Sequence, residues 1–153
     1  MTTKGAAHCM MTAGSMEFSE DARAILEKPL LAVVATTRDD GSPHCVPVWF
    51  RFDGALIRVW SGGEYRWVNN ARARPRIAMT ICDTSDRFSG AVIVHGEASV
   101  GGGDDEETSK EIRRIAGRYM TPDAVDPYLR RFTHLRTIIT IKATSVRAWS
   151  TAE

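Results

Sequence analysis

The sequence predicts a mainly β, α+β fold: six antiparallel strands that form a small barrel, with flanking helices. Three observations predict it. Short runs rich in β-branched and aromatic residues alternate with turn sequences, two Asp-Gly turns join three strands in succession, and a length of 153 residues suits one domain. Strands connected through tight turns form an antiparallel meander rather than a parallel βαβ sheet. Six short strands of this kind usually close or partly close into a barrel, because closure hides their edges.

The first half of the chain predicts one helix followed by the three-stranded meander. The helix spans residues 18–28, where Ser19 is a suitable N-cap and Pro29 stops the helix. Each strand that follows is a short apolar run, and each turn contains Asp-Gly, which tolerates the positive φ that hairpins require. The strands are Leu30–Thr37, His44–Phe52 and Ala55–Trp60, with turns at 39–42 and 53–54.

The second of these strands is unusual because Pro47 lies inside it. Proline cannot donate to a strand ladder, so this strand is expected at a sheet edge or at a bulge. Such a break exposes backbone groups that a planar ligand could use, and Trp49 lies on the same face as Pro47. The alternative is an ordinary edge strand with a packed tryptophan.

The second half of the chain predicts three helices and three strands. Gly96, within a strand, indicates a bulge or the close approach of another backbone. Asp104 and Glu107 form an acidic variant of a capping box, which marks the start of a helix. The helices are Glu64–Arg74, Asp104 to about Arg118, and Pro122–Phe132, and the strands are Arg76–Cys82, Ala91–Val100 and Arg136–Trp149.

Composition and charge argue against several function classes. The net charge is +1, from 20 basic and 19 acidic residues, so neither nucleic acid nor a membrane is expected as a partner. No apolar run approaches the roughly 20 residues that span a bilayer, and residues 1–15 are predicted to be a disordered lead-in rather than a signal peptide. Three cysteines without a Cys-x-x-Cys pair and four scattered histidines predict no disulfide and no metal site. We therefore expect a cytoplasmic protein with one domain over residues 16–153.

The segment spanning residues 60–70 carries the clearest functional signal. A strand ends in a Ser-Gly-Gly loop, and a helix begins a few residues later. The first turn of a helix has unpaired N–H groups and the positive end of the helix dipole, which together favour an anion. Ser61 adds a hydroxyl donor, and Arg66 offers a forked guanidinium to a phosphate. The pattern indicates a phosphate site, and the alternative is a capped surface helix with solvated arginines.

Four runs carry a family resemblance through their order and spacing: ATTRDDGSPHCVPVWFRFDG, VWSGGEYRWVNNARARPRIAMTICD, AVIVHGEASV and RTIITIKATSVRAW. The chain resembles the split-barrel flavin-binding superfamily, which includes the pyridoxamine 5′-phosphate oxidases and their FMN- or deazaflavin-dependent relatives. The likeness extends from about residue 18 to residue 149. It implies a homodimer of six-stranded split barrels that holds FMN or the deazaflavin coenzyme F420 in the clefts between subunits.

The resemblance assigns cofactor contacts to residues by their position. Arg66 matches a phosphate-binding base, and Asn70 matches the asparagine of a recurrent Asn-x-x-x-x-Pro-Arg stretch. Ser61 and Gly62 match strand-end residues beside the cofactor phosphate and ribityl chain. The strand that contains Val46–Trp49 matches the one that runs along the flavin ring. The candidate cofactor-binding residues are Val46, Pro47, Val48, Trp49, Trp60, Ser61, Gly62, Arg66, Trp67 and Asn70.

The resemblance also implies an oxidoreductase that moves a hydride to or from a small organic substrate, with no catalytic side chain assigned. Trp67 stands where many relatives carry a lysine, so one phosphate charge is missing. The arginine-rich ending of true pyridoxamine phosphate oxidases is not apparent after Trp149, so vitamin B6 oxidation is not expected. Arg51 aligns roughly with a substrate-phosphate lysine of those oxidases. The alternatives are a non-catalytic protein that binds or sequesters a flavin, haem or tetrapyrrole, and a member that has lost its cofactor.

Overall fold

The computed structural model describes residues 16–87 and 89–151, and the predicted lead-in at residues 1–15 lies outside them. No helix in the described ranges is both long and apolar enough to cross a membrane. The helices are α1 (Glu20–Leu26), α2 (Arg66–Ala73), α3 (Glu106–Ala116), α4 (Pro122–Leu129) and the short 3₁₀ helix η1 (Arg130–Phe132). The strands are β1 (Ala32–Thr37), β2 (Pro43–Val48), β3 (Phe50–Phe52), β4 (Leu56–Ser61), β5 (Arg76–Asp83), β6 (Gly90–Gly102) and β7 (Thr137–Ser150).

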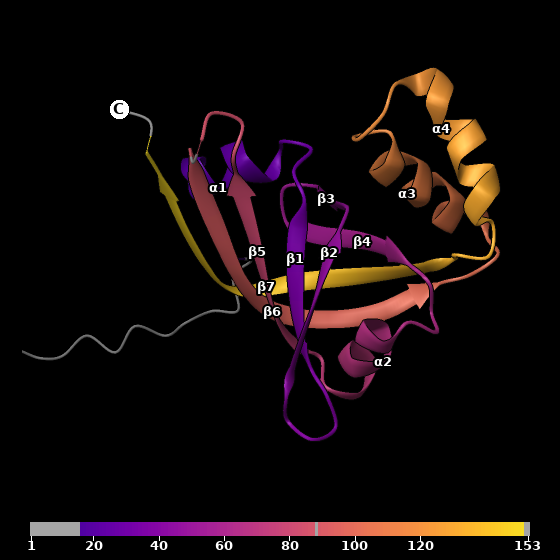
Figure 1. The fold of residues 1–153 in the computed structure, drawn as a ribbon, viewed down its shortest axis with the longest axis horizontal. Coiled ribbons are helices and arrows are strands. Elements are labelled where there is room, and N and C mark those ends of the chain that lie inside the picture. The colour runs from indigo at the N-terminus through magenta and orange to yellow at the C-terminus, as the bar shows by residue number, and fades with distance from the viewer. Residues whose placement is uncertain (1–15, 88, 152–153) are drawn as a thin grey trace, which may run out of the picture.

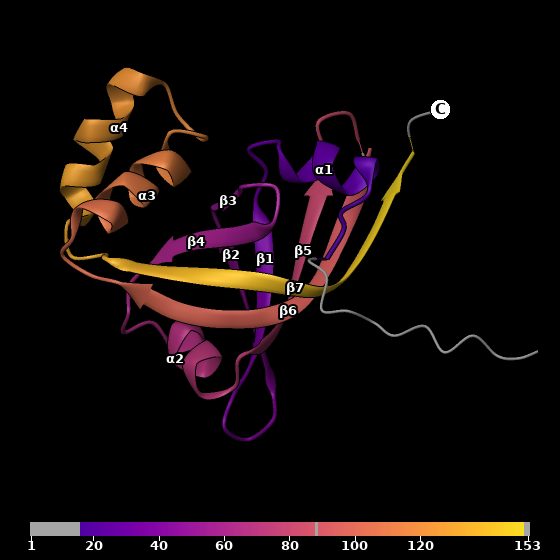
Figure 2. The same cartoon turned by 180° about the vertical axis from the view of Figure 1, so that it is seen from behind.

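The strands form one antiparallel sheet in the order β2-β1-β5-β6-β7-β4-β3. The sheet curls, so that β1 and β2 run across the direction of β4 and β7 (Figures 1 and 2). This confirms the predicted antiparallel split barrel with flanking helices. The strand count is seven instead of six, because the strand predicted over 44–52 is interrupted at Trp49. Its two parts, β2 and β3, lie at opposite edges of the sheet.

The local signals in the first half of the chain are confirmed. Ser19 caps α1, where its hydroxyl oxygen accepts the Ala22 N–H at 3.2 Å. Both Asp-Gly turns contain a glycine in the left-handed region, with φ of +84° at Gly41 and +100° at Gly54. Pro47 lies in β2, which is an edge strand as predicted.

In the second half, the prediction for Gly96 is confirmed and the start of α3 is corrected. The register between β6 and β7 shifts at Gly96, and a Cβ atom there would lie 2.6 Å from the carbonyl oxygen of Lys142. A bulge and a close backbone approach are therefore both present. Asp105, not Asp104, caps α3 and accepts the Thr108 N–H at 2.8 Å, since the helical backbone starts one residue later than predicted.

The main core lies between the sheet and helices α1 and α2. Alternation along each strand buries one face, including Phe50, Ile57 and Ile141, while Leu26 of α1 and Val68 of α2 cover that face. A smaller cluster lies beneath α3 and α4, where the tryptophans of the strand break and of β4 meet the helices. Its members are Ile112, Ile115 and Ile138, with Trp49, Trp60 and Leu129 packed against them.

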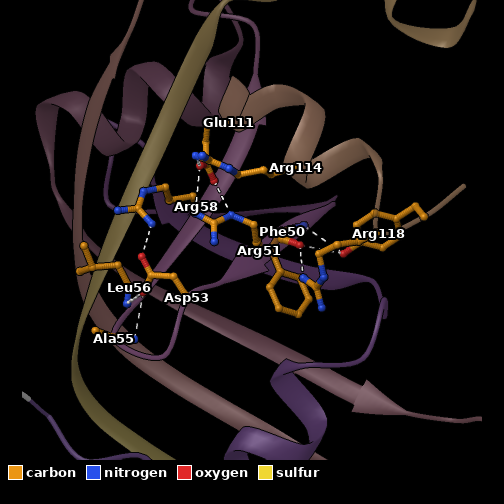
Figure 3. A network of polar contacts seen from close by, with 10 residues as sticks. Phe50, Arg51, Asp53, Ala55, Leu56, Arg58, Glu111, Arg114 and Arg118 are labelled. Atoms are coloured by element: carbon orange, nitrogen blue, oxygen red, sulfur yellow. Dashed lines mark hydrogen bonds and ion pairs between the residues drawn. The ribbon is translucent and has the colours of Figure 1, made fainter. Parts of the chain in front are cut away.

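Helix α3 is tied to β3 by charged side chains, as Figure 3 shows. Arg51 donates from Nε and Nη2 to the two carboxylate oxygens of Glu111, at 2.7 and 2.9 Å. Arg114 lies 3.4 Å from the same carboxylate. This paired, two-pronged contact fixes the helix relative to the strand that follows the break.

Two carboxylates with low pKa values make the fold sensitive to acid. Burial opposes the ionisation of Asp53, but the Leu56 N–H and the Arg58 ion pair lower the pKa of Asp53 to about 2 (Figure 3). Hydrogen bonding from Lys28 lowers the pKa of Asp83 to about 2, and this side chain is only 2% exposed. Both values lie below the 3.8 of an unperturbed aspartate.

We expect the free energy of unfolding to be nearly constant above about pH 5 and to fall between about pH 4 and pH 2. A depressed pKa stabilises the folded state only while the carboxylate is ionised, so the contribution is lost as the pH falls through the folded-state value. Urea titrations at about pH 6 and pH 3 measure the difference. Asp83→Asn should lower stability at pH 6 and reduce the difference between the two pH values. An undiminished difference in this variant would contradict the assignment.

Candidate functional site

Eight of the ten predicted cofactor residues line one cavity of about 570 Å³. The cavity lies where the ends of β2 and β4 meet the start of α2, and α4 and η1 close one side. Its lining is mainly aromatic and aliphatic with a few polar groups, which is typical of sites for organic ligands. The eight residues are Val46, Pro47, Val48, Trp49, Trp60, Ser61, Arg66 and Trp67.

The other two predicted residues lie outside the cavity lining. Asn70 is 7% exposed and its amide donates to Thr36 Oγ1 at 3.1 Å, so it holds α2 against β1. It lines a neighbouring pocket of about 400 Å³ that shares Arg66 with the cavity. A Cβ atom on Gly62 would lie 2.9 Å from Leu135 Cδ2, so glycine allows Leu135 to reach the cavity. Contact of either residue with a cofactor stays a prediction.

Further cavity residues were not singled out from the sequence. Tyr128 and Phe132 come from α4 and η1, where a spacing of four places them on one side of the helical segment, with ring centroids 4.9 Å apart. This spacing is visible in the sequence, but nothing there indicates which strand ends the helix covers. The remaining residues of this group are Leu31, His44, Tyr65 and Leu135.

Successive ring contacts build an aromatic wall along the cavity. The Tyr128 ring lies 5.4 Å from Trp49 and 6.4 Å from Trp60, measured between centroids. Trp60 meets Phe132 edge-on at 6.3 Å, and its indole N–H donates to the Leu135 carbonyl at 2.7 Å. All four rings are half-buried, and their mutual contacts restrict the orientations that each can adopt.

Arg66 supplies the polar end of the cavity. Its guanidinium forms no hydrogen bond or ion pair with the residues that the structure describes. The backbone N–H groups of Arg66 and Trp67 likewise have no acceptor among the described residues. Ser61 Oγ accepts the Trp67 indole N–H at 3.2 Å, which leaves the Ser61 hydroxyl proton available. A cation, unpaired helix N–H groups and a hydroxyl donor together suit an anion such as phosphate.

The other arginines near α2 have protein partners. Arg72 donates to Asn69 Oδ1 at 2.6 Å. Arg74 donates to the Thr37 carbonyl at 2.8 Å and pairs with Asp39 at 2.8 Å. Neither lines the cavity, so Arg66 differs from them in both position and lack of partners.

His44 contributes an imidazole ring to the cavity lining. Arg38 Nη2 lies 3.1 Å from His44 Nδ1, and because a guanidinium only donates, Nδ1 accepts and the ring proton lies on Nε2. Arg38 Nε is itself buried without a hydrogen-bond partner among the described residues. Over residues 16–87 and 89–151, no three His, Cys, Asp or Glu side chains are grouped to hold a metal ion.

Arg51, which aligns roughly with a substrate-phosphate lysine, does not line this cavity. Its guanidinium is bonded through two nitrogens to Glu111, and this hydrogen bonding raises the pKa of Arg51. The side chain therefore serves the contact between β3 and α3 described above.

Comparison with known proteins relates this geometry to a family. Residues 18–150 match the pyridoxamine 5′-phosphate oxidase family. The chain belongs to this family. The matched range contains every helix of the described structure and every strand, including the segments that line the cavity.

Individual relatives carry more specific names. An F420H2-dependent biliverdin reductase of Mycobacterium tuberculosis is 36% identical over 107 residues, which cover 68% of this chain and 74% of that protein. A solved F420 reductase covers 85% of this chain and 98% of its own, with a TM-score of 0.68 and 24% identity. A conserved hypothetical protein of M. tuberculosis covers 97% of this chain and 90% of its own, with a TM-score of 0.72 and 23% identity. The two solved structures share the fold of this chain.

Proposed function

We propose that the protein is a reductase that uses a flavin-type coenzyme to transfer a hydride to a conjugated organic substrate. The name of the F420H2-dependent relative favours coenzyme F420 over FMN, and its biliverdin substrate favours a tetrapyrrole. The observation that carries the proposal is a single cavity that joins an aromatic wall to Arg66, which has no partner among the described residues.

The residues of the cavity fit such a coenzyme. FMN and F420 each combine a flat three-ring system with a ribityl chain and a phosphate. The aromatic wall that includes Trp49 and Trp60 suits the rings, while Arg66 and Ser61 suit the phosphate. The volume of about 570 Å³ lies in the usual range for organic ligands. Trp67, at the position of the missing lysine, is 4% exposed and bonded to Ser61, so Arg66 would supply the positive charge.

In this proposal the coenzyme supplies the hydride, and the chain binds, orients and excludes water. Arg66 and Ser61 would hold the phosphate end, and the open edge of β2 near Pro47 would offer backbone groups to the ring. His44 would donate its Nε2 proton in a hydrogen bond to an oxygen or nitrogen of the bound molecule. Fixing two reactants in contact removes much of the entropic barrier to transfer between them.

A second candidate is binding of a flavin, haem or tetrapyrrole without turnover. Among the described residues, no carboxylate and no lysine lines the cavity, so side chains for proton transfer are scarce. An aromatic cavity with one cation would suit storage or sequestration as well as catalysis. The two candidates differ in whether the bound ligand is reduced.

We also propose that the protein acts as a cytoplasmic homodimer. Leu31, which lines the cavity, is 58% exposed, and Val33 on the same strand segment is 38% exposed. A second copy over these side chains would remove apolar surface from water and enclose the cavity. Within residues 16–87 and 89–151, the thiols of Cys45 and Cys82 are free and exposed, which suits a reducing compartment. Sedimentation analysis of wild type and Leu31→Asp tests the dimer.

We expect the purified protein to bind F420 more tightly than FMN and to reduce biliverdin when reduced F420 is supplied. Separate titrations followed by visible absorption and tryptophan fluorescence measure binding, since Trp49 and Trp60 line the cavity. Loss of biliverdin absorbance measures turnover. Tight binding of FMN alone would assign the flavin instead. Tight binding without reduction would favour sequestration, and failure of the folded protein to bind either coenzyme would overturn the proposal.

A further inference from the structure

The strand break at Trp49 is covered by a residue that follows α3. The chain leaves β2 at Val48 and enters β3 at Phe50, on the opposite edge of the sheet. Trp49 occupies this gap and lines the cavity. Its indole is stacked on the ring of Tyr119, with centroids 4.7 Å apart and planes inclined by 7°. The stack therefore limits how the Trp49 ring can turn.

The Tyr119 hydroxyl also holds the backbone on two sides of the cavity. It accepts the Phe50 N–H at 3.0 Å, and its own proton has two acceptors in reach, the carbonyl of Leu30 at 2.9 Å and that of Phe50 at 3.2 Å. Phe50 directly follows Trp49, and Leu30 directly precedes Leu31, so each bonded residue adjoins one that lines the cavity. Burial raises the pKa of Tyr119, so the hydroxyl keeps its proton at neutral pH.

The neighbouring Arg118 holds the same stretch of backbone. Its guanidinium donates to the carbonyl of Phe50 (Figure 3). It also donates to the carbonyls of Leu26 and Lys28, at 3.0 and 2.6 Å. It also lies over the Phe50 ring, 4.7 Å from the centroid. No carboxylate pairs with Arg118 among the described residues, and burial lowers its pKa. Its hydrogen bonds thus join the residue after the break, Phe50, to the end of α1 and the chain that leads to β1.

We propose that Tyr119 is a positioning residue, which orients the Trp49 ring and fixes the spacing of Trp49 and Leu31 across the cavity. The consequence for ligand binding rests on the proposed function, because a fixed indole recognises a flat conjugated ring system, the class to which the flavin coenzymes and tetrapyrroles belong. The ion pair between Glu111 of α3 and Arg51 of β3 provides a comparison, because it joins these two elements without a ring contact or hydrogen bond to Trp49. Glu111 bonds to Arg51, and it contacts neither Trp49 nor Leu30 through a hydrogen bond or ring.

The test compares Tyr119→Phe, which removes the hydroxyl, with Tyr119→Leu, which removes both hydroxyl and ring. We expect the Kd for F420, or for FMN if that is the coenzyme bound, to rise about threefold to tenfold in Tyr119→Phe and further in Tyr119→Leu. The near-ultraviolet circular dichroism signal of Trp49 is identified as the part that Trp49→Phe removes. This signal should decrease in Tyr119→Phe and decrease further in Tyr119→Leu. Glu111→Gln is the matched control: its Tm should fall, while its Kd stays within about twofold of wild type and its spectrum is unchanged.

Each outcome decides one of the two proposals. Wild-type Kd and spectrum in both Tyr119 variants would overturn the positioning role and leave the proposed function intact, and an equal rise of Kd in Glu111→Gln would also overturn that role. If the wild type binds neither coenzyme, the proposed function fails, and the spectral comparison with Trp49→Phe still decides whether Tyr119 orients the ring. If Tyr119→Leu does not fold, Tyr119→Phe carries the test, since it keeps the packed ring.

Discussion

Replacing Arg66 with alanine should weaken coenzyme binding by about 1.5–3 kcal/mol, or roughly 10- to 150-fold in Kd. No other arginine and no lysine lines the cavity within the described residues, so no nearby cation can replace the lost one. Arg66 has no protein partner there, so its removal breaks no described hydrogen bond or ion pair of the fold. The loss should therefore appear in ligand binding, measured by fluorescence titration, rather than in thermal stability.

Two variants on the same helix sharpen this test. Arg72→Ala removes an arginine that is bonded to Asn69 and does not line the cavity, so its Kd should stay near that of wild type. Arg66→Lys keeps the charge but loses the forked geometry, and should bind with intermediate affinity. Equal affinity of Arg66→Ala and wild type would contradict the phosphate assignment. A similar loss in Arg72→Ala would attribute the effect to the helix as a whole.

The strand predicted over residues 44–52 is divided in the structure, and it shows what the sequence pattern cannot predict. Apolar residues alternate from His44 to Phe52 without a change of phase, and Val48 and Phe50 are both buried, so the pattern gives no sign of an interruption. The break at Trp49 is held by Tyr119, 69 residues from Phe50 in sequence, whose hydroxyl accepts the Phe50 N–H and lies within reach of the Phe50 carbonyl. Local periodicity reports which face is buried, whereas such distant contacts decide where the strand changes its neighbours.

The part of the candidate site that the backbone forms at the start of α2 could be predicted from the sequence. The parts that depend on packing between distant elements could be predicted less well. The helix start after Ser61 leaves N–H groups and Arg66 unpaired, and the order of residue types shows this directly. Contact of Asn70 with the coenzyme stays a prediction, and its hydrogen bond to Thr36 could not be predicted from the sequence, because it depends on how α2 packs against β1. Tyr128 was missed for the same reason, because its place beside Trp49 depends on how α4 packs against the sheet.

A large loss of stability from a single methyl group is expected at Gly96. A Cβ atom there would lie 2.6 Å from the carbonyl oxygen of Lys142 and 3.1 Å from Ile141 Cγ2. The first of these atoms belongs to the backbone of the paired strand, so it cannot turn away as a side chain would. Gly96→Ala must therefore separate β6 from β7 at the bulge, at a cost of about 1–3 kcal/mol. Thermal unfolding should show a Tm roughly 2–10 °C lower.

Gly101 in the same strand provides the control for this prediction. A Cβ atom at Gly101 meets nothing within 4 Å, and its backbone lies outside the left-handed region. Gly101→Ala should therefore be neutral or stabilise the fold by about 0.4–1 kcal/mol, because alanine restricts the unfolded chain. The two variants make the same chemical change in one strand, but only Gly96→Ala is expected to lower Tm. A loss of equal size at both positions would mean that β6 generally disfavours the change, and that the contact with Lys142 is not the cause.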